Sequence, residues 1–187
     1  MEINYSNINN LSLQSIITSA TYFFIREIFP KNKLHLAKCI KLTISRHQLT
    51  RLKTSNNTSL GLIYILDQGY KPKEFRISIR TNKVNLLWLL TTLAHEIIHI
   101  KQYRLGELVD TVHGSKWKGK FYAEVGSNKK VSKRVLYRRY HDLPWEREAW
   151  EKEDILFKKF INKHNIKLKD VKRCYFKTIQ KQISGEI

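Results

Sequence analysis

The feature that most constrains this chain is the pentapeptide H-E-I-I-H, which lies inside a long apolar run. Its histidines, His95 and His99, are four residues apart, so on an α-helix both imidazoles lie on one face and can point a ring nitrogen at one position. Glu96 is rotated by about 100° from His95, which leaves its carboxylate beside that position. A catalytic zinc ion needs such a set: ligands, and a base for the water on its open coordination position. The motif therefore predicts one Zn²⁺ ion bound by His95 and His99, with Glu96 as the catalytic residue.

The residues around this motif favour a central, buried helix. The apolar run occupies residues 86–94, Asn82 or Asn85 can cap the start, and Gly106 suits the C-terminal stop. Apolar residues surround the helix on nearly all sides, so unpaired His and Glu side chains there would be costly without a metal ion or hydrogen-bond partners. The alternative is that the three polar residues met by chance on a buried helix.

A third metal ligand is expected downstream, because a catalytic zinc ion normally takes three protein ligands. A helix is predicted from Pro144, a residue that suits the first helical position. Glu146 lies one turn before Ala149 on the apolar stripe of this helix, whereas Glu148 lines up with a solvated face. An inward carboxylate needs a partner, and a metal ion is a suitable one. We expect Glu146 to be the third ligand, with Glu148 and His113 as alternatives.

The order of predicted elements indicates an α+β fold. We expect a helix at 11–29, strands at 39–45, 60–66 and 74–80, the H-E-x-x-H helix, an irregular region at 107–130 with a short strand at 117–122, and a helix from Pro144 to Ile161 or beyond. A polar loop is expected at 53–59. The elements predict a small antiparallel or mixed sheet packed on the central helix, with flanking N- and C-terminal helices. Two of the strands can form a hairpin whose edge accepts an extended peptide.

Composition favours one domain spanning residues 1–187, with a basic C-terminal helical extension at about 151–187, since 42% of the residues are hydrophobic. Cys39 and Cys174 are the only cysteines and form no paired motif, which makes a reducing cytoplasm the expected compartment, or the host cytoplasm if the chain is phage-encoded. The N-terminus lacks the basic region of a secretory signal, and the apolar stretch at 16–25 is too short and too polar to span a membrane. We expect no membrane partner, and the sequence carries no signal for an oligomeric state.

The net charge of +19 is unevenly distributed. Residues 31–53 and 128–141 contain no acid, and 158–181 is strongly basic. Such segments attract nucleic acid, and Tyr137 and Tyr140 are interleaved among the basic residues of the second one. The alternative is a lysine-rich, well-solvated surface. Nucleic acid is therefore a candidate partner beside a protein or peptide substrate.

Two motifs together resemble a known family. H-E-I-I-H at 95–99 followed by E-R-E-A at 146–149 resembles the zincin metallopeptidases, of gluzincin type, whose third ligand is the first Glu of an E-x-x-A-[D/N] motif, as in CAAX prenyl peptidases and ImmA/IrrE regulators. The strings A-H-E-I-I-H-I-K-Q-Y-R-L-G-E-L, W-K-G-K and P-W-E-R-E-A are similar to small metallopeptidases of bacteriophages and bacteria. The resemblance runs from about Leu86 to Trp150, and it departs from the motif at Trp150, which occupies the D/N position.

A second resemblance supplies the main alternative. H-G-S-K-W at 113–117 is similar to the H-G-x-x-[F/W] motif of SprT-like proteases, in which a histidine is the third ligand. That resemblance implies a protease acting on DNA-associated proteins, with His113 in the ligand role.

The expected function is that of a zinc-dependent metalloendopeptidase in which Glu96 takes the proton of the attacking water. Candidate donors to the oxyanion are Tyr137, Tyr140, His141 and His113. The alternatives from other classes are a non-catalytic, zinc-containing nucleic-acid-binding module and a basic nucleic-acid-binding domain without metal. Glu96 discriminates between them, because a structural zinc site does not need a free carboxylate.

Overall fold

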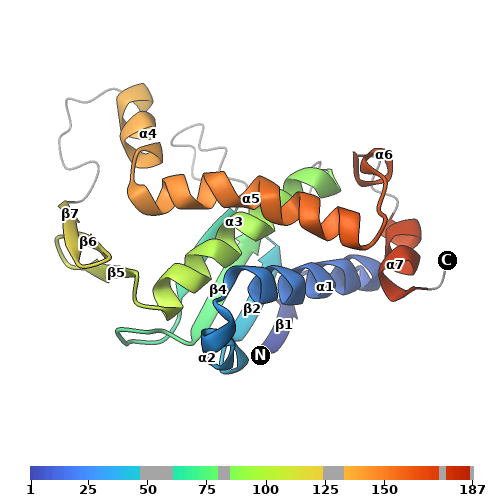
Figure 1. The fold of residues 1–187 in the computed structure, drawn as a ribbon, viewed down its shortest axis with the longest axis horizontal. Helices are drawn as coiled ribbons and strands as arrows, with labels where there is room; N and C mark the ends of the chain where they lie inside the picture. Colours follow the sequence, from blue (N-terminus) through green and yellow to red (C-terminus); the bar gives the residue numbers. More distant parts are fainter. Residues whose placement is uncertain (47–60, 80–84, 124–132, 173–175, 186–187) are drawn as a thin grey trace.

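The computed structural model describes residues 1–46, 61–79, 85–123, 133–172 and 176–185, and the fold is α+β as predicted (Figure 1). Its helices are α1 (Leu11–Ile28), α2 (Leu34–Lys38), α3 (Leu86–Arg104), α4 (Lys133–His141), α5 (Pro144–Lys163), α6 (Leu168–Lys172) and α7 (Phe176–Ser184), with a 3-10 turn, η1 (Lys31–Lys33). Its strands are β1 (Glu2–Ser6), β2 (Lys41–Arg46), β3 (Gly61–Ile65), β4 (Glu74–Ile79), β5 (Leu108–Thr111), β6 (Gly114–Trp117) and β7 (Lys120–Ala123).

Four strands form a mixed sheet in the order β1-β2-β4-β3. The first three strands in this order are parallel, and β3 runs antiparallel to β4 at the edge of the sheet. Leu42 and Ile44 of β2 and Phe75 and Ile77 of β4 are fully buried on one face, as alternating strands require. Strands β3 and β4, which pair antiparallel, form the expected hairpin.

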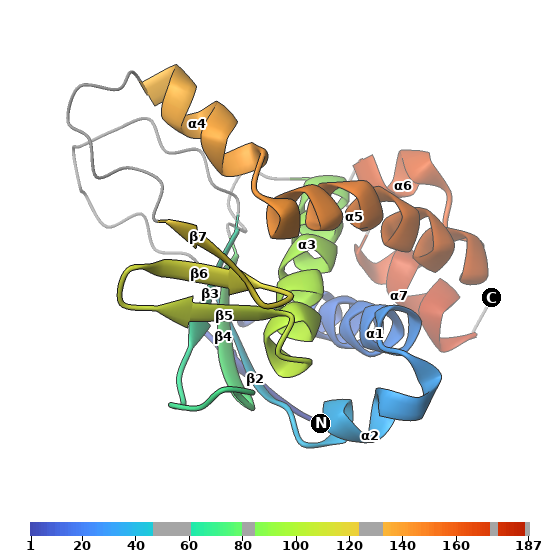
Figure 2. The same cartoon turned by 60° about the vertical axis from the view of Figure 1, so that its left-hand side comes forward.

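The helices cover the buried face of this sheet. Figure 2 shows α3 between the sheet and α5, and α1 packs against both α3 and α5. Tyr5 of β1 ties α1 to the sheet, because its hydroxyl donates to the carbonyl of Gln14 and shares a hydrogen bond with Thr18. The ring of Phe160 on α5 packs edge-on against the rings of Phe23 and Phe24 on α1. One apolar core thus links the sheet to α5.

Helix α3 begins and ends at the residues that local chemistry favours. Asn85 is the N-cap, and its Oδ1 accepts a hydrogen bond from the backbone N–H of Trp88 at 2.9 Å; Asn82 lies outside the described residues. At the other end Gly106 has φ of 70°, and Glu107 donates back to the carbonyl of Gln102. This is the left-handed cap that favours glycine, so the predicted stop is confirmed.

The expectation of an irregular region after Gly106 was wrong. Strands β5, β6 and β7 form a small antiparallel sheet, and the turn at Lys118 and Gly119 interrupts the strand that was expected at 117–122. Both turn residues have positive φ, 47° and 86°, as a tight two-residue hairpin turn requires. Lysine at the first of these positions is a weak turn signal, which is why the pattern was read as one strand.

The other element predictions agree with the structure to within two residues where they fall on described residues. The predicted helices at 11–29 and from Pro144 correspond to α1 and α5, and the three predicted strands correspond to β2, β3 and β4. Strand β1 and helices α2 and α4 were not predicted. The predicted loop at 53–59 lies outside the described residues. In the C-terminal segment at 151–187, residues 151–163 belong to α5, whose apolar face is part of the main core.

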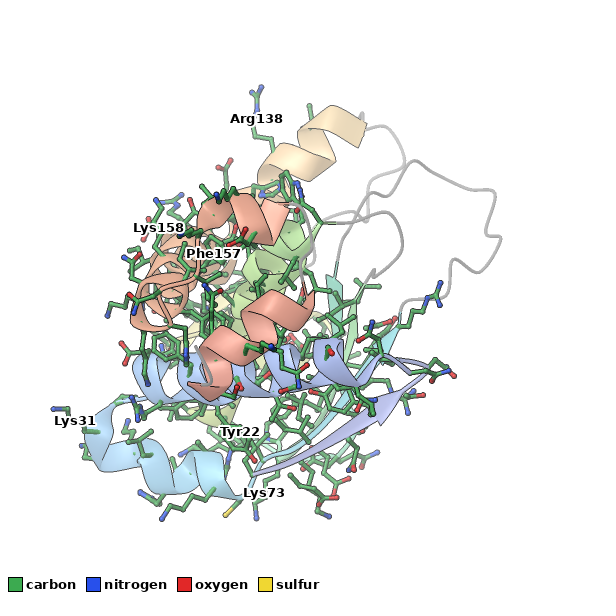
Figure 3. All side chains as sticks on the ribbon, turned by 90° about the vertical axis from the view of Figure 1, so that its right-hand side faces the viewer. Tyr22, Lys31, Lys73, Arg138, Phe157 and Lys158 are labelled. Carbon is green, nitrogen blue, oxygen red and sulfur yellow. The ribbon has the colours of Figure 1, made fainter. Side chains whose placement is uncertain are left out.

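Basic side chains extend outward from several elements rather than from one. Lys31 in η1, Arg138 in α4 and Lys158 in α5 are all exposed, and Figure 3 shows Lys31 and Arg138 pointing away from the body of the molecule. Among the described residues, no helix combines the length and the apolarity needed to cross a membrane.

Candidate metal centre

The structure brings together the three residues that the sequence predicted as ligands. His95 and His99 lie one turn apart on α3, and Glu146 lies in the first turn of α5. The two Nε2 atoms are 3.1 Å apart, and each lies 3.4 Å from a different carboxylate oxygen of Glu146. The side chains are 13%, 6% and 3% exposed, so this is a buried cluster with a small opening at His95. The three residues could hold a metal ion.

The two imidazole–carboxylate separations are longer than usual hydrogen bonds and are close to the separations between ligand atoms of one metal ion. Ligand atoms placed tetrahedrally at ~2.0–2.1 Å from an ion are separated by about 3.3 Å, close to the distances observed here. Nitrogen–oxygen hydrogen bonds are normally shorter, at about 2.9 Å. Moreover, Oε2 of Glu146 is buried and has no hydrogen-bond partner. A buried carboxylate oxygen without a donor is costly, and a cation at the shared position would satisfy it.

The charges of the cluster are arranged to receive a cation. Burial acts to raise the pKa of Glu146, but its interactions with His95, His99 and Tyr140 outweigh burial and hold that pKa well below its usual value. Burial likewise acts to lower the pKa of His95, yet the carboxylates of Glu146 and Glu153 raise it to about 10. The carboxylates therefore favour positive charge within the cluster.

Two contacts position the start of α5 so that Glu146 reaches α3. Ala149 is fully buried, and its small side chain lets the two helices approach closely. Trp145 packs against Trp117 of β6 and edge-on against Tyr122 of β7, so the small sheet anchors the N-terminus of α5. Glu146 itself faces inward, which confirms the orientation expected from the apolar stripe.

Each imidazole is also held on the side away from the cluster. Nδ1 of His95 lies 2.7 Å from Oε2 of Glu153 on α5, and Nδ1 of His99 lies 2.8 Å from Oε1 of Gln102 on α3. Both Nε2 atoms therefore face the shared position. Sequence reasoning missed Gln102 and Glu153, because their spacing from the motif residues indicates a helical face but not which partner they meet.

Glu96 lies beside the three-residue group and is not part of it. It is buried, and burial raises its pKa. The backbone of β3 passes directly over it, since a Cβ atom on Gly61 would lie 2.7 Å from Oε1 of Glu96 and 2.5 Å from Cγ2 of Thr92. Only glycine allows this approach. Gly61 was not identified from the sequence, although a single glycine inside a strand pattern is a known signal of close backbone approach.

The two alternative ligands are not part of the group. His113 is exposed in the turn between β5 and β6. The expectation that Glu148 lies on a solvated face was wrong, because α5 packs against the end of α3: Glu148 accepts hydrogen bonds from Gln102 at 2.8 Å and from Lys152 at 2.6 Å. Although burial opposes it, these contacts and the nearby Lys101 lower the pKa of Glu148 to about 2.

Two of the candidate oxyanion donors lie near the cluster. Tyr140 interacts with the carboxylate of Glu146, and burial raises the pKa of Tyr140, so its hydroxyl keeps its proton. The ring of His141 lies 4.9 Å from that of Trp150, which in turn lies 5.1 Å from the ring of His95. Trp150 therefore contacts His95 through its ring, at the position where the resembling motif has Asp or Asn. The side chain of Tyr137 lies outside the described part of the chain.

Comparisons with known proteins leave the interpretation of the centre to its own geometry. No protein-family model matches the chain, and no curated protein and no solved structure matches it either.

Proposed function

We propose that this protein is a zinc-dependent metalloendopeptidase with a zincin-like arrangement of its site. The observation that carries this proposal is the buried set of His95, His99 and Glu146, which offer three ligand atoms that all lie within 4.8 Å of one another. Two imidazoles and one carboxylate form a common ligand set of catalytic zinc, which leaves a fourth position open. The resemblance of the two sequence motifs to zincins supports the same function.

The side chains around the cluster can carry out peptide hydrolysis. A bound zinc ion would polarise the scissile carbonyl and lower the pKa of the attacking water. Glu96 takes the proton from that water and passes it to the leaving amine, and its raised pKa brings it closer to working pH, where a general base is most effective. The protonated hydroxyl of Tyr140, which interacts with Glu146, is the proposed donor to the oxyanion that forms on the carbonyl oxygen.

The edge strand β3 supports an extended peptide as the substrate. Among the described residues this strand pairs with β4 alone, and at Gly61 it passes over the carboxylate of Glu96. A peptide that adds to its free edge would lie beside the proposed base. The exposed side chains of Leu62 and Tyr64 on β3 give apolar surface for its side chains.

Metal analysis combined with one isosteric substitution tests the proposal. The purified protein should contain one zinc ion per chain and cleave an unfolded protein such as fluorescein-labelled casein. Glu96→Gln should retain the zinc but lose cleavage, by on the order of 10²–10⁴-fold, because only the base is removed. Glu151→Gln, on an exposed face of α5, is the matched control and should leave both unchanged.

The net charge of +19 favours one further candidate, a zinc-containing module that binds nucleic acid without catalysis. The same experiment separates the two functions. Full zinc content with no cleavage by the unmodified protein, tested on several unfolded proteins, would favour the non-catalytic module.

A further inference from the structure

We propose that Gln102 and Glu153 are positioning residues: Gln102 sets the tautomer of His99, and Glu153 holds the Nδ1–H group of His95, so that the Nε2 atoms of both rings face the position of the metal. The inference rests on the proposed metal centre and adds what holds it in its receptive form. Both residues depend on the docking of α5 onto α3, so the same packing that delivers Glu146 also orients the imidazoles.

The orientation of the Gln102 amide is determined by its other contacts. Its Nε2 group lies 3.0 Å from the carbonyl oxygen of Trp145 and 2.8 Å from the carboxylate of Glu148, and both of these atoms can only accept. The amide nitrogen must therefore face them, which turns Oε1 toward Nδ1 of His99 at 2.8 Å. An amide oxygen only accepts, so Nδ1 of His99 carries the proton and its Nε2 keeps the lone pair that a metal ion needs.

Glu148 is itself held, which makes this orientation firm. It accepts hydrogen bonds from Lys152 at 2.6 Å and from the buried Lys101 at 3.4 Å. Lys101 also donates to Glu107 at 2.6 Å. The second glutamate of the E-R-E-A motif is thus explained as the anchor of the Gln102 amide.

Glu153 orients the ring of His95 as Gln102 orients that of His99, but its acceptor is a charged carboxylate. Its carboxylate lies 2.7 Å from Nδ1, both side chains are largely buried, and a carboxylate of this kind only accepts. Glu153 lies seven residues after Glu146, two turns along the same face of α5. His99 is therefore held by a neutral amide and His95 by an anion. The anion raises the basicity of the His95 ring, so His95 should be the stronger ligand for a metal cation.

The first test reads the tautomer directly, with no metal and no substrate. Long-range ¹H–¹⁵N NMR spectra of the chelator-treated protein should show His99 protonated at Nδ1 at a pH where its ring is neutral. Gln102→Met removes the acceptor and should shift His99 toward the Nε2–H form. Gln102→Glu keeps an acceptor for Nδ1 but places a second carboxylate beside Glu148, so it should keep the Nδ1–H tautomer. A merely structural role of Gln102 would instead make the two variants alike, or the glutamate variant the worse one.

The second test measures zinc affinity by competition with a chromophoric chelator. Glu153→Leu and Gln102→Met should each weaken zinc binding by about 10–100-fold, which is typical for the loss of a group that orients a ligand. Glu153→Gln keeps an acceptor without the charge and should weaken binding less than Glu153→Leu. The exposed Glu151→Gln is the control and should bind as the unmodified protein does.

The outcomes distinguish this inference from the proposed function. Unchanged His99 tautomers in Gln102→Met, or affinities within about twofold of the unmodified protein in every variant, would overturn the inference while the metal centre stands. If the unmodified protein binds no zinc, the proposed function fails, and the tautomer experiment still decides the role of Gln102. Glu153→Gln and Gln102→Glu preserve side-chain size, so the comparison remains possible if a larger change prevents folding.

Discussion

Replacing Gly61 with alanine tests whether the edge strand sets the position of Glu96. The new Cβ atom would lie 2.5 Å from Cγ2 of Thr92 and 2.7 Å from Oε1 of Glu96, whereas such atoms normally approach to about 3.5 Å. Relief of these two close contacts therefore requires the new Cβ atom and its neighbours to move apart by about 1 Å. Thr92 is short and lies on the rigid helix α3, so the end of Glu96 and the strand itself are what can move.

The expected effect is larger on catalysis than on stability. Overpacking of this size costs about 1–3 kcal/mol of unfolding free energy. A misplacement of about 1 Å in a reacting group costs on the order of 10²-fold in kcat. Zinc affinity should change little, since the atoms nearest to a Cβ on Gly61 belong to Thr92 and Glu96 and not to a proposed ligand.

The assay compares casein cleavage and zinc affinity of Gly61→Ala with those of Gly69→Ala. A Cβ atom on Gly69 would meet no atom within 4 Å, so this control should behave as the unmodified protein does. Full activity of Gly61→Ala would refute the proposed link between β3 and Glu96. A loss of activity accompanied by an equal loss of bound zinc would also refute it, because the change would then act on the metal.

Three further predictions concern the stability of the chelator-treated protein, measured by urea denaturation. Phe160→Ala should lower the unfolding free energy by about 3–5 kcal/mol, because this fully buried ring packs on two others; a loss below about 1 kcal/mol would contradict its place in the core. Asn85→Ala should lower the unfolding free energy by about 1 kcal/mol, because it removes the N-cap of α3, whereas Asn85→Ser can still cap the helix and should retain most of that stability. Glu148→Gln should cost about 1 kcal/mol at pH 7, since Glu148 is partly exposed. In the folded protein the pKa of Glu148 is lowered from 4.5 to about 2, so its contribution to stability is present above pH 4.5 and is lost as the pH falls toward 2. The unfolding free energies of Glu148→Gln and the unmodified protein should therefore converge near pH 2. A difference that stays constant from pH 7 to about pH 2.5 would contradict this.

The part of the centre that could be predicted from the sequence is the part set by helical periodicity. The spacing of His95 and His99 places them on one face, and the apolar stripe of the last helix turns Glu146 inward. Both conclusions depend on residues within a few turns of one another. The cap at Asn85 and the stop at Gly106 are equally local.

The features that could not be predicted depend on contacts between distant segments. Strand β1 pairs with β2 across the intervening helices α1 and α2, and its short, half-buried sequence carries little signal of its own. The roles of Gln102 and Glu153 follow from how α5 docks on α3, which no single-helix pattern contains. Glu148 was placed on a solvated face for the same reason, because its helical phase says nothing about the end of α3 that covers it.

The central claim is that His95, His99 and Glu146 jointly bind one metal ion, and calorimetric titration of zinc into the chelator-treated protein tests it most directly. The structure predicts one zinc ion per chain for the unmodified protein. It also predicts a loss of about 10²-fold or more in affinity for Glu146→Ala, since removing a ligand should cost at least as much as removing a group that orients one. The absence of binding by the unmodified protein, or equal binding by both proteins, would contradict the account.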